Sequence, residues 1–526
     1  MSDFPWYVRL LFAMASGAAM ALSFPNYNLP LLAWVSVGLL ILASCGARSW
    51  AGLSYGFVHG IVFYPLSVPW IDTVMHQYGN VGSLTAASIL ALLSLAFAIF
   101  PAVFGWAIAR IASKLRPGKN WGFVCVLAPF LWVALEYART YLILGGFPWN
   151  LTGYAASGSL GLVQLVALTG IYGLSFVVVS WSSLVAYAIV SGRERAWKAA
   201  LVFTGVLILW GVGGKYFVPV AVPHHLAHLV QTDFPQSEEY PSNWMQLHAP
   251  DMAQLERISV GAAQDTPERP SLIIWPEVPA PFTMQDPAFT QLAQTIARQS
   301  MGDFLVGIVD WKRLATGGWT ASNSAILLNP VGLRTFTYDK IHLVPFGEFV
   351  PYRKWLTFAG RLTADIGDFT PGSTFSVGQL PDGRFGVFIC YEAIFPAEVR
   401  EFTRHGAQLL INISNDGWFG RSAAPAQHLM MARVRAVENR RWLLRDTNNG
   451  FTASIDPYGR IVAEMPTDVR SELQAPYDFR SGLTPYARLG DWFAWLCVIA
   501  SVALLVTAFV QRSPRAAKKP NPQIRV

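Results

Sequence analysis

Eight long apolar runs occupy the first 220 residues of the chain and a stretch near its end. Seven of them, rich in Leu, Val, Ala, Phe and Gly, cover residues 8–24, 29–45, 51–71, 84–109, 121–141, 162–190 and 197–218, and the eighth covers 491–510. Each run is near or above the roughly 20 residues that a helix needs to cross the hydrocarbon core of a bilayer. The pattern predicts a polytopic α-helical membrane protein with eight spans.

The low content of charged residues fits this interpretation. Asp, Glu, Lys and Arg make up 13% of the 526 residues, against about 25% in soluble proteins. A cleaved signal peptide is the alternative for the first run, which is short and rich in small residues. Asp3 opposes Arg9 in its flank, however, and six further runs follow directly. We therefore expect this run to remain a span.

Lys and Arg are distributed unevenly among the loops between the runs. They occupy the loops after the second, fourth and sixth runs and the tail RSPRAAKK, whereas the loops after the first, third and fifth runs have none. Cytoplasmic loops carry such an excess of basic residues. We therefore expect both termini in the cytoplasm. The net charge of +7 then implies no nucleic-acid partner, because most of the excess lies in these loops.

The chain changes after Val218 from long apolar runs to alternating short strands and helices. Strand candidates are 226–231, 271–275, 304–309, 324–329, 385–390, 408–414 and 442–447, and helix candidates are 243–264, 287–300, 396–405 and 425–441. The strand candidates are uniformly apolar, as in sheets covered on both faces. We predict four parts: a seven-helix membrane domain over 1–218, an exported α/β domain over 219–488, a membrane helix over 489–511 and a basic cytoplasmic tail over 512–526.

Cys390 is alone in the exported domain, because the other three cysteines lie in predicted spans. It has no partner there for an internal disulfide, so its thiol is either buried packing or a chemically useful group. It ends an apolar strand candidate, Glu277 follows another in LIIWPE, and Lys340 lies in TYDKIHLVPFGEFVP. Sites of α/β proteins form at such strand ends. A thiolate nucleophile needs a base and a cation to hold the developing oxyanion, and these residue types supply both.

The motifs around these residues resemble the nitrilase superfamily over roughly residues 225–475. They are IIWPE, YDKIHLVPFGEFVP, GVFICYE, LLINISNDGWFG and ARVRAVENRRWLLRDTNNGFTASIDPYGRI. The resemblance implies an αββα sandwich in which Cys390 is the nucleophile, Glu277 the general base and Lys340 the cation that stabilises the tetrahedral intermediate. The supporting residues that it implies are Glu348, Tyr391 and Glu392.

The surrounding apolar runs narrow the resemblance to the apolipoprotein N-acyltransferase family of bacteria, over nearly the whole chain. LVPFGEFVP, NDGWFG and TPYAR fit this branch better than soluble amidases. The resemblance implies a multi-pass protein of the inner membrane with its catalytic domain in the periplasm. Its cysteine would take an acyl chain from a phospholipid, usually phosphatidylethanolamine, as a thioester and pass it to the diacylglyceryl-cysteine of an apolipoprotein. One departure from the family is Asp446, where we expect a small uncharged residue.

Further expectations concern lipid access, metals and assembly. The segment 346–362 combines aromatic and basic side chains, which suits either a loop at the lipid interface or an ordinary packed loop. We hypothesise a lipid entrance formed by Trp355, Phe358, Trp418 and Phe419. The histidines at 224, 225 and 228 lack an acidic or cysteine ligand at suitable spacing, so we expect no metal. We also expect no cofactor and a monomer.

Two other functions fit parts of the sequence. A membrane-tethered amidohydrolase would use the same three residues with water as acceptor, although a single anchor would suffice for it. A transporter with an accessory domain would place polar residues in several spans, and only Glu136 and Arg139 stand out. Because charge in a span is costly, these two residues either pair with each other or face a lipid headgroup.

Overall fold

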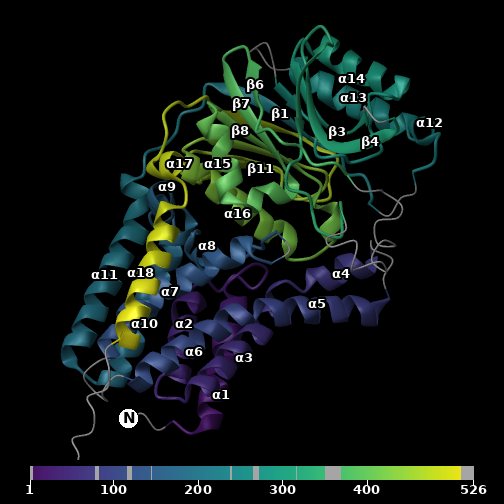
Figure 1. Cartoon of the computed structure of the whole chain (residues 1–526). Helices are drawn as coiled ribbons and strands as arrows, with labels where there is room; N and C mark the ends of the chain where they lie inside the picture. Colours follow the sequence, from purple (N-terminus) through teal and green to yellow (C-terminus); the bar gives the residue numbers. More distant parts are fainter. Residues whose placement is uncertain are drawn as a thin grey trace, which may run out of the picture.

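A bundle of apolar helices and an α/β domain at one end of it make up the computed structural model (Figure 1). The structure describes residues 4–77, 82–114, 121–143, 145–236, 240–264, 272–314, 317–349 and 369–510. The predicted tail over 512–526 lies outside these ranges.

The helices of the bundle follow the predicted apolar runs. They are α1 (Trp6–Leu22), α2 (Leu31–Ser44), α3 (Ser49–Ser67), α4 (Trp70–Gln77), α5 (Ser83–Phe97), α6 (Ile99–Lys114), α7 (Trp121–Tyr141), α10 (Ile171–Ser191), α11 (Glu194–Phe217) and α18 (Trp492–Val510). Among the described residues, four helical segments are long and apolar enough to cross a membrane: Ser83–Ser113, which joins α5 and α6, and the helices α7, α10 and α11. The helices α3 and α4 would make a fifth span together, across a 52° bend. Three more apolar helices are shorter: α1, α2 and Trp492–Ala508. A helix lies in every predicted run, and eight crossings remain a prediction.

The sixth predicted run is shorter as a helix than we expected. Its first part forms two short turns, η1 (Leu162–Leu165) and α9 (Val166–Thr169), and α10 begins only after Gly170, whose φ is +66°. A Cβ at this glycine would lie 2.6 Å from the ring of Tyr486, so this backbone position suits glycine alone. The apolar residues of these turns contact the α/β domain, where Gln164 donates a hydrogen bond to the carbonyl oxygen of Tyr458 (3.0 Å).

Two six-stranded sheets form the centre of the α/β domain. The first has the order β12 (Ser471–Tyr477), β1 (His225–Gln231), β2 (Leu272–Ile274), β3 (Asp303–Arg313), β4 (Trp319–Leu328) and β5 (Arg334–Asp339). The second has the order β11 (Ile461–Glu464), β10 (Ala453–Ile455), β9 (Trp442–Thr447), β8 (Leu409–Ser414), β7 (Gly383–Ile389) and β6 (Val377–Leu380). The strands β1, β2 and β3 are parallel, as are β7, β8 and β9, and all other neighbours are antiparallel.

Helices cover the outer face of each sheet (Figure 1). The pairs are α13 (Ala249–Gln264), which α12 (Trp244–Leu247) precedes, with α14 (Pro287–Ser300), and α15 (Pro396–Arg404) with α16 (Ala424–Asn439). Ile273 packs in the core under α13 and α14, whereas its neighbours Leu272 and Ile274 belong to the core shared with the second sheet. Alternate strand residues thus bury opposite faces. The predicted αββα sandwich is present.

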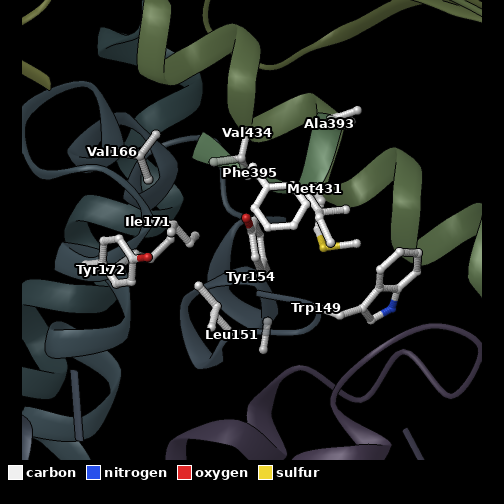
Figure 2. Close-up of a cluster of buried hydrophobic side chains, with 14 of the residues drawn as sticks. Trp149, Leu151, Tyr154, Val166, Ile171, Tyr172, Ala393, Phe395, Met431 and Val434 are labelled. Carbon is white, nitrogen blue, oxygen red and sulfur yellow. The ribbon is translucent and has the colours of Figure 1, made fainter. Parts of the chain in front are cut away.

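The apolar core of the α/β domain continues into the membrane helices. Figure 2 shows one part of this junction, where α10 and α16 meet the loop after α7, the short helix α8 (Thr152–Ala156) and the turn after β7. The membrane domain contributes Trp149, Leu151, Tyr154, Ile171 and Tyr172, and the α/β domain contributes Ala393, Phe395, Met431 and Val434. All of these side chains are buried. The two parts therefore share one packed core at the base of α16.

Gln427 makes the polar contacts of the same junction. Its Oε1 accepts hydrogen bonds from the indole N–H groups of Trp70 (3.3 Å) and Trp149 (2.6 Å). Its Nε2 donates to the carbonyl oxygens of Pro25 (2.7 Å) and Ser67 (2.9 Å). One amide in α16 thus holds three segments of the membrane domain.

Replacing Gln427 by Leu is expected to lower the stability of the protein. The change leaves two indole donors and two carbonyl oxygens without their partner, and each unsatisfied buried group costs about 1–3 kcal/mol. Thermal unfolding of the detergent-solubilised protein should show a lower Tm. The exposed Gln299 in α14 gives the matched control, since Gln299→Leu removes the same amide far from the junction. Equal Tm values for the two variants would contradict this role of Gln427.

Candidate active site

Cys390 lies where the chain leaves β7. It begins the short 3-10 helix η3 (Cys390–Ile394), and its φ is +48°. Non-glycine residues rarely adopt this conformation, and strained positions of this kind gather at functional sites. The residue is 7% exposed. The bend therefore places a buried thiol at the carboxyl edge of the second sheet.

Glu277, Lys340 and Glu348 form a buried cluster with Asn323. Lys340 follows β5 and donates hydrogen bonds from Nζ to Oε1 of Glu277 and Oε1 of Glu348, each at 3.0 Å. Asn323 in β4 donates from Nδ2 to the same two oxygens, each at 2.8 Å. The four residues are at most 9% exposed. The structure thus brings Glu277, Lys340 and Glu348 together.

The parallel strands explain why Glu277 reaches this place. It follows β2 closely, and its Oε2 accepts a hydrogen bond from the backbone N–H of Asn415 (2.9 Å), which follows β8. Carboxyl ends of parallel strands meet at one edge of a sheet, and here those of the two sheets lie side by side. Glu277 is therefore held by both sheets, and its orientation is fixed before any substrate arrives.

Cys390 lies within the electrostatic influence of this cluster. Burial, and then the negative charge of Glu277, raise the pKa of the Cys390 thiol well above its usual value, although the charge of Lys340 opposes this shift. The thiol is therefore protonated at neutral pH and needs a base when it reacts. Burial lowers the pKa of Lys340, but the charges of Glu277 and Glu348 outweigh it and hold the pKa well above its usual value. Lys340 thus stays a cation that can stabilise an oxyanion.

Glu392 connects the turn of Cys390 to the segment after Lys340. Its Oε1 accepts hydrogen bonds from the hydroxyl of Tyr338 (2.7 Å) and the backbone N–H groups of Ile341 (2.7 Å) and His342 (3.2 Å). Its Oε2 accepts one from the backbone N–H of Ile389 (2.7 Å). Burial raises the pKa of Glu392 to about 7. This carboxylate therefore fixes the nucleophile relative to the cation.

Glu392→Gln is expected to destabilise the protein by about 1–3 kcal/mol, because the amide nitrogen cannot accept the hydrogen bonds that one carboxylate oxygen now accepts. Turnover should fall as well, since Cys390 and Lys340 lose their common support. The measurements are Tm and rate in parallel. Glu401→Gln is the control, because Glu401 contacts Arg404 on the surface of α15 (2.8 Å). A variant with normal Tm and normal rate would contradict the role assigned to Glu392.

His428 in α16 contacts the backbone of Cys390. Its Nε2 lies 3.0 Å from the carbonyl oxygen of Cys390, and its Nδ1 lies 3.1 Å from both Nη2 of Arg445 and Oδ1 of Asp416. Burial lowers the pKa of His428, so the ring is neutral. Because a carbonyl oxygen can only accept, Nε2 carries a proton and donates it to the carbonyl oxygen of Cys390. His428 thus holds the backbone of the nucleophile, and its place in the fold agrees with a structural role.

Of the remaining predicted residues, the structure describes Tyr391, Trp418 and Phe419. Tyr391 is buried next to Cys390, where its ring contacts His342 and Phe395. Trp418 and Phe419 end the turn η4 (Asp416–Phe419), which follows β8. Trp355 and Phe358 lie outside the described residues, as does most of the segment 346–362.

Asp446 is fully buried in β9, and its Oδ2 has no hydrogen-bond partner among the described residues. Burial raises the pKa of Asp446 well above its usual value. The residue that we expected to be small and uncharged is thus a buried aspartate, and the hydrogen bonds among Glu277, Lys340 and Glu348 are intact.

Two residues of the site were missed from the sequence, Asn323 and Asn415, whereas Glu392 was named as a supporting residue without its hydrogen-bond partners. Asn415 follows an apolar strand in the same way as Glu277, so the same signal could have found it. Asn323 lies inside β4, between Ser322 and Ser324, and a buried amide in a strand needs a polar partner. Neither pattern predicts that the hydrogen-bond partner is Glu277, because Glu277 is distant in the sequence from both asparagines.

Comparisons with known proteins agree with this geometry. Residues 16–184 match the apolipoprotein N-acyltransferase N-terminal domain, and residues 239–479 match the carbon-nitrogen hydrolase family. The apolipoprotein N-acyltransferase of Geobacter metallireducens is 36% identical over 531 residues, which covers 98% of each chain. The chain belongs to the apolipoprotein N-acyltransferase family. The member from Azotobacter vinelandii is 34% identical and also covers 98% of each chain.

Membership in the apolipoprotein N-acyltransferase family confirms the predicted acyltransferase with a carbon-nitrogen hydrolase domain, and the apolar helices fit a membrane protein. A solved structure of Saccharomyces cerevisiae Nit3, a member of branch 10 of the nitrilase superfamily, is 21% identical with a TM-score of 0.36. It covers 48% of this chain and 90% of its own.

Proposed function

We propose that the protein transfers a fatty acyl chain from a phospholipid to the N-terminal diacylglyceryl-cysteine of apolipoproteins, with Cys390 as the covalent carrier. The observation that supports this most is the buried thiol at the bend after β7, beside a carboxylate and a cation that are already paired. The acceptor is inferred from the family, and the chemical steps are inferred from the residues of the site.

In the first half-reaction Glu277 takes the proton of the Cys390 thiol while the sulfur attacks the ester carbonyl of the phospholipid. Lys340 stabilises the oxyanion of the tetrahedral intermediate. The bond from carbon to the glycerol oxygen then breaks, and Glu277 returns the proton to that oxygen. A lysophospholipid leaves, and the acyl chain remains on Cys390 as a thioester.

In the second half-reaction the α-amino group of the diacylglyceryl-cysteine attacks the thioester carbonyl. Glu277 takes a proton from the amine, the bond from carbon to sulfur breaks, and the thiolate recovers its proton from Glu277. The product is an amide. Because the two substrates use one site in turn, the kinetics are ping-pong.

A water molecule at the thioester would convert the same site into a hydrolase. The proposed acyltransferase requires that lipid rather than water reaches Cys390, and the apolar core that joins the site to the membrane helices supports this. We propose eight spans, both termini in the cytoplasm and the domain over 219–488 in the periplasm of the inner membrane. We also propose phosphatidylethanolamine as the donor and a monomeric enzyme.

Phe419 supports one part of the proposed lipid entrance. Its ring contacts the rings of Trp70 (5.1 Å) and Trp149 (6.0 Å), which belong to the membrane domain, and that of His428 (6.0 Å). Aromatic rings of this kind suit the membrane interface. We propose that this cluster, together with Trp355 and Phe358, borders the path of the acyl chain to Cys390.

Synthetic acceptor peptides test the proposed function. The purified protein, phosphatidylethanolamine vesicles and a peptide that begins with diacylglyceryl-cysteine should yield a peptide heavier by one acyl chain. The same peptide with an acetylated α-amino group should gain nothing. If free fatty acid accumulates and neither peptide gains mass, the protein is a membrane-tethered hydrolase and the proposal is wrong.

A further inference from the structure

Three arginines surround one aromatic ring where the α/β domain meets the end of α11. The guanidinium carbons of Arg440, Arg480 and Arg460 lie 4.8, 5.5 and 6.0 Å from the ring centre of Tyr458. All four residues are partly exposed. The face of a tyrosine ring attracts cations, so one ring holds three like charges together. We call Arg440, Arg460 and Arg480 the arginine cluster.

The arginine cluster keeps a surplus of positive charge. Asp456 pairs with Arg460 (3.0 Å), whereas neither Arg440 nor Arg480 forms an ion pair with a carboxylate among the described residues. The neighbouring Arg441 feels the repulsion, since burial, and then the charge of Arg480, lower the pKa of Arg441 to about 10. An anion at this place would therefore be attracted by several cations at once.

Arg440 and Arg480 also have hydrogen-bond donors to spare. Arg440 donates from Nη1 to Oε1 of Gln164 (2.5 Å) and to the carbonyl oxygen of Pro457 (3.1 Å), and Arg480 donates from Nη1 to the hydroxyl of Tyr458 (3.4 Å). In the part of the chain that the structure describes, Nε and Nη2 of both arginines have no hydrogen-bond partner. The fork of a guanidinium matches two oxygens of a phosphate, so the available donors suit a phosphate group.

The end of α11 places the arginine cluster at the level of lipid headgroups. Arg460 donates hydrogen bonds to the carbonyl oxygens of Val218 (2.8 Å) and Pro219 (2.6 Å), which directly follow this helix. The 24 residues of α11 are long and apolar enough to cross a membrane. They extend over about 36 Å at 1.5 Å per residue, against roughly 30 Å for the hydrocarbon core. The residues after α11 therefore lie just outside that core.

The last turns of α11 present an apolar surface next to the arginine cluster. Leu209, Val212 and Phe217 are exposed large apolar residues of these turns. In a membrane-spanning helix such side chains face acyl chains. A phosphate that carries acyl chains would thus find contacts here that a free phosphate ion cannot make.

We propose that the arginine cluster binds the phosphate of an anionic phospholipid, in the leaflet on the side of the α/β domain, with the acyl chains along α11. Arg440 and Arg480 hold the phosphate oxygens. The surplus of positive charge favours a headgroup without a cation and disfavours the ammonium of phosphatidylethanolamine. The site is therefore separate from the acyl-transfer reaction and gives the α/β domain a lipid contact beside α11.

Equilibrium binding of short-chain lipids to full-length Cys390→Ser protein in a neutral detergent tests the proposal without turnover. Dioctanoyl phosphatidylglycerol should bind about tenfold more tightly than dioctanoyl phosphatidylcholine, and this preference should shrink as the NaCl concentration rises. Arg480→Gln and Arg440→Gln should each weaken binding of the first lipid about tenfold and leave the second unchanged. Arg298→Gln is the matched control, because Arg298 is an exposed residue of α14, which covers the outer face of the first sheet.

Equal affinity of the Cys390→Ser protein for the two lipids would overturn the proposal, whether or not the arginine variants fold. A preference for phosphatidylglycerol that survives in both arginine variants would overturn it too, since the anionic lipid would then bind elsewhere. Inorganic phosphate separates the two sources of the anion. At the same concentration as the lipid it should not displace phosphatidylglycerol, and full displacement would show a site for a free anion instead.

Discussion

Cys390→Ser is expected to lower the rate of peptide N-acylation by about 10⁴-fold or more, in line with the loss of a covalent nucleophile in other enzymes. A serine hydroxyl gives up its proton far less readily than a thiol, and the base at this site is a carboxylate. The measurement is the initial rate with phosphatidylethanolamine vesicles and the diacylglyceryl-cysteine peptide.

Cys125→Ser is the matched control for this variant. Cys125 is a half-buried thiol in α7 that takes no part in the cluster around Lys340. Its replacement should leave the rate within about twofold of the parent, as for most substitutions away from the site. Substantial N-acylation by folded Cys390→Ser protein would remove Cys390 from the mechanism.

Glu277→Gln is the second large effect, with an expected loss of about 10²–10⁴-fold in the rate of thioester formation, the range that general base catalysis contributes. Burial raises the pKa of the Cys390 thiol, so the thiol stays protonated when the base is gone. The NH₂ group of the new glutamine would also face either the ammonium of Lys340 or the backbone N–H of Asn415. Both of these groups are donors, so one hydrogen bond of Glu277 would be lost.

Single-turnover formation of the acyl adduct measures this effect apart from the second half-reaction. Glu472→Gln is the control, because Glu472 in β12 contacts His228 (2.7 Å) at the opposite side of the first sheet. It should form the adduct at the parental rate. If Glu277→Gln acylates Cys390 as fast as this control, another group is the base.

Sequence patterns predicted the parts of this fold that are uniformly apolar. All seven predicted strands are present, as are the helices at 243–264, 287–300, 396–405 and 425–441, because each has a fully buried face. The missed strands β5, β6, β10, β11 and β12 lie outside the parallel centres of the sheets. Most positions of β11 and β12 are partly exposed, so these strands lack the apolar run that marks the others.

Residue types and motifs predicted which residues belong to the candidate site, but not how they contact one another. Glu277, Lys340 and Cys390 stand at the ends of strands, and the structure brings the first two into direct contact. Pairings across the domain could not be read from the sequence. Asn323 and Glu277 lie 46 positions apart, and Gln427 and Trp70 are separated by 357. Only the packing of two sheets on a helix bundle makes these residues neighbours.

The intact mass of the protein after incubation with phosphatidylethanolamine vesicles tests the covalent role of Cys390 most directly. The account predicts an added fatty-acyl mass that hydroxylamine removes and that Cys390→Ser protein lacks. No adduct on folded protein with its native cysteine, under conditions where the acceptor peptide is still acylated, would contradict a thioester on Cys390.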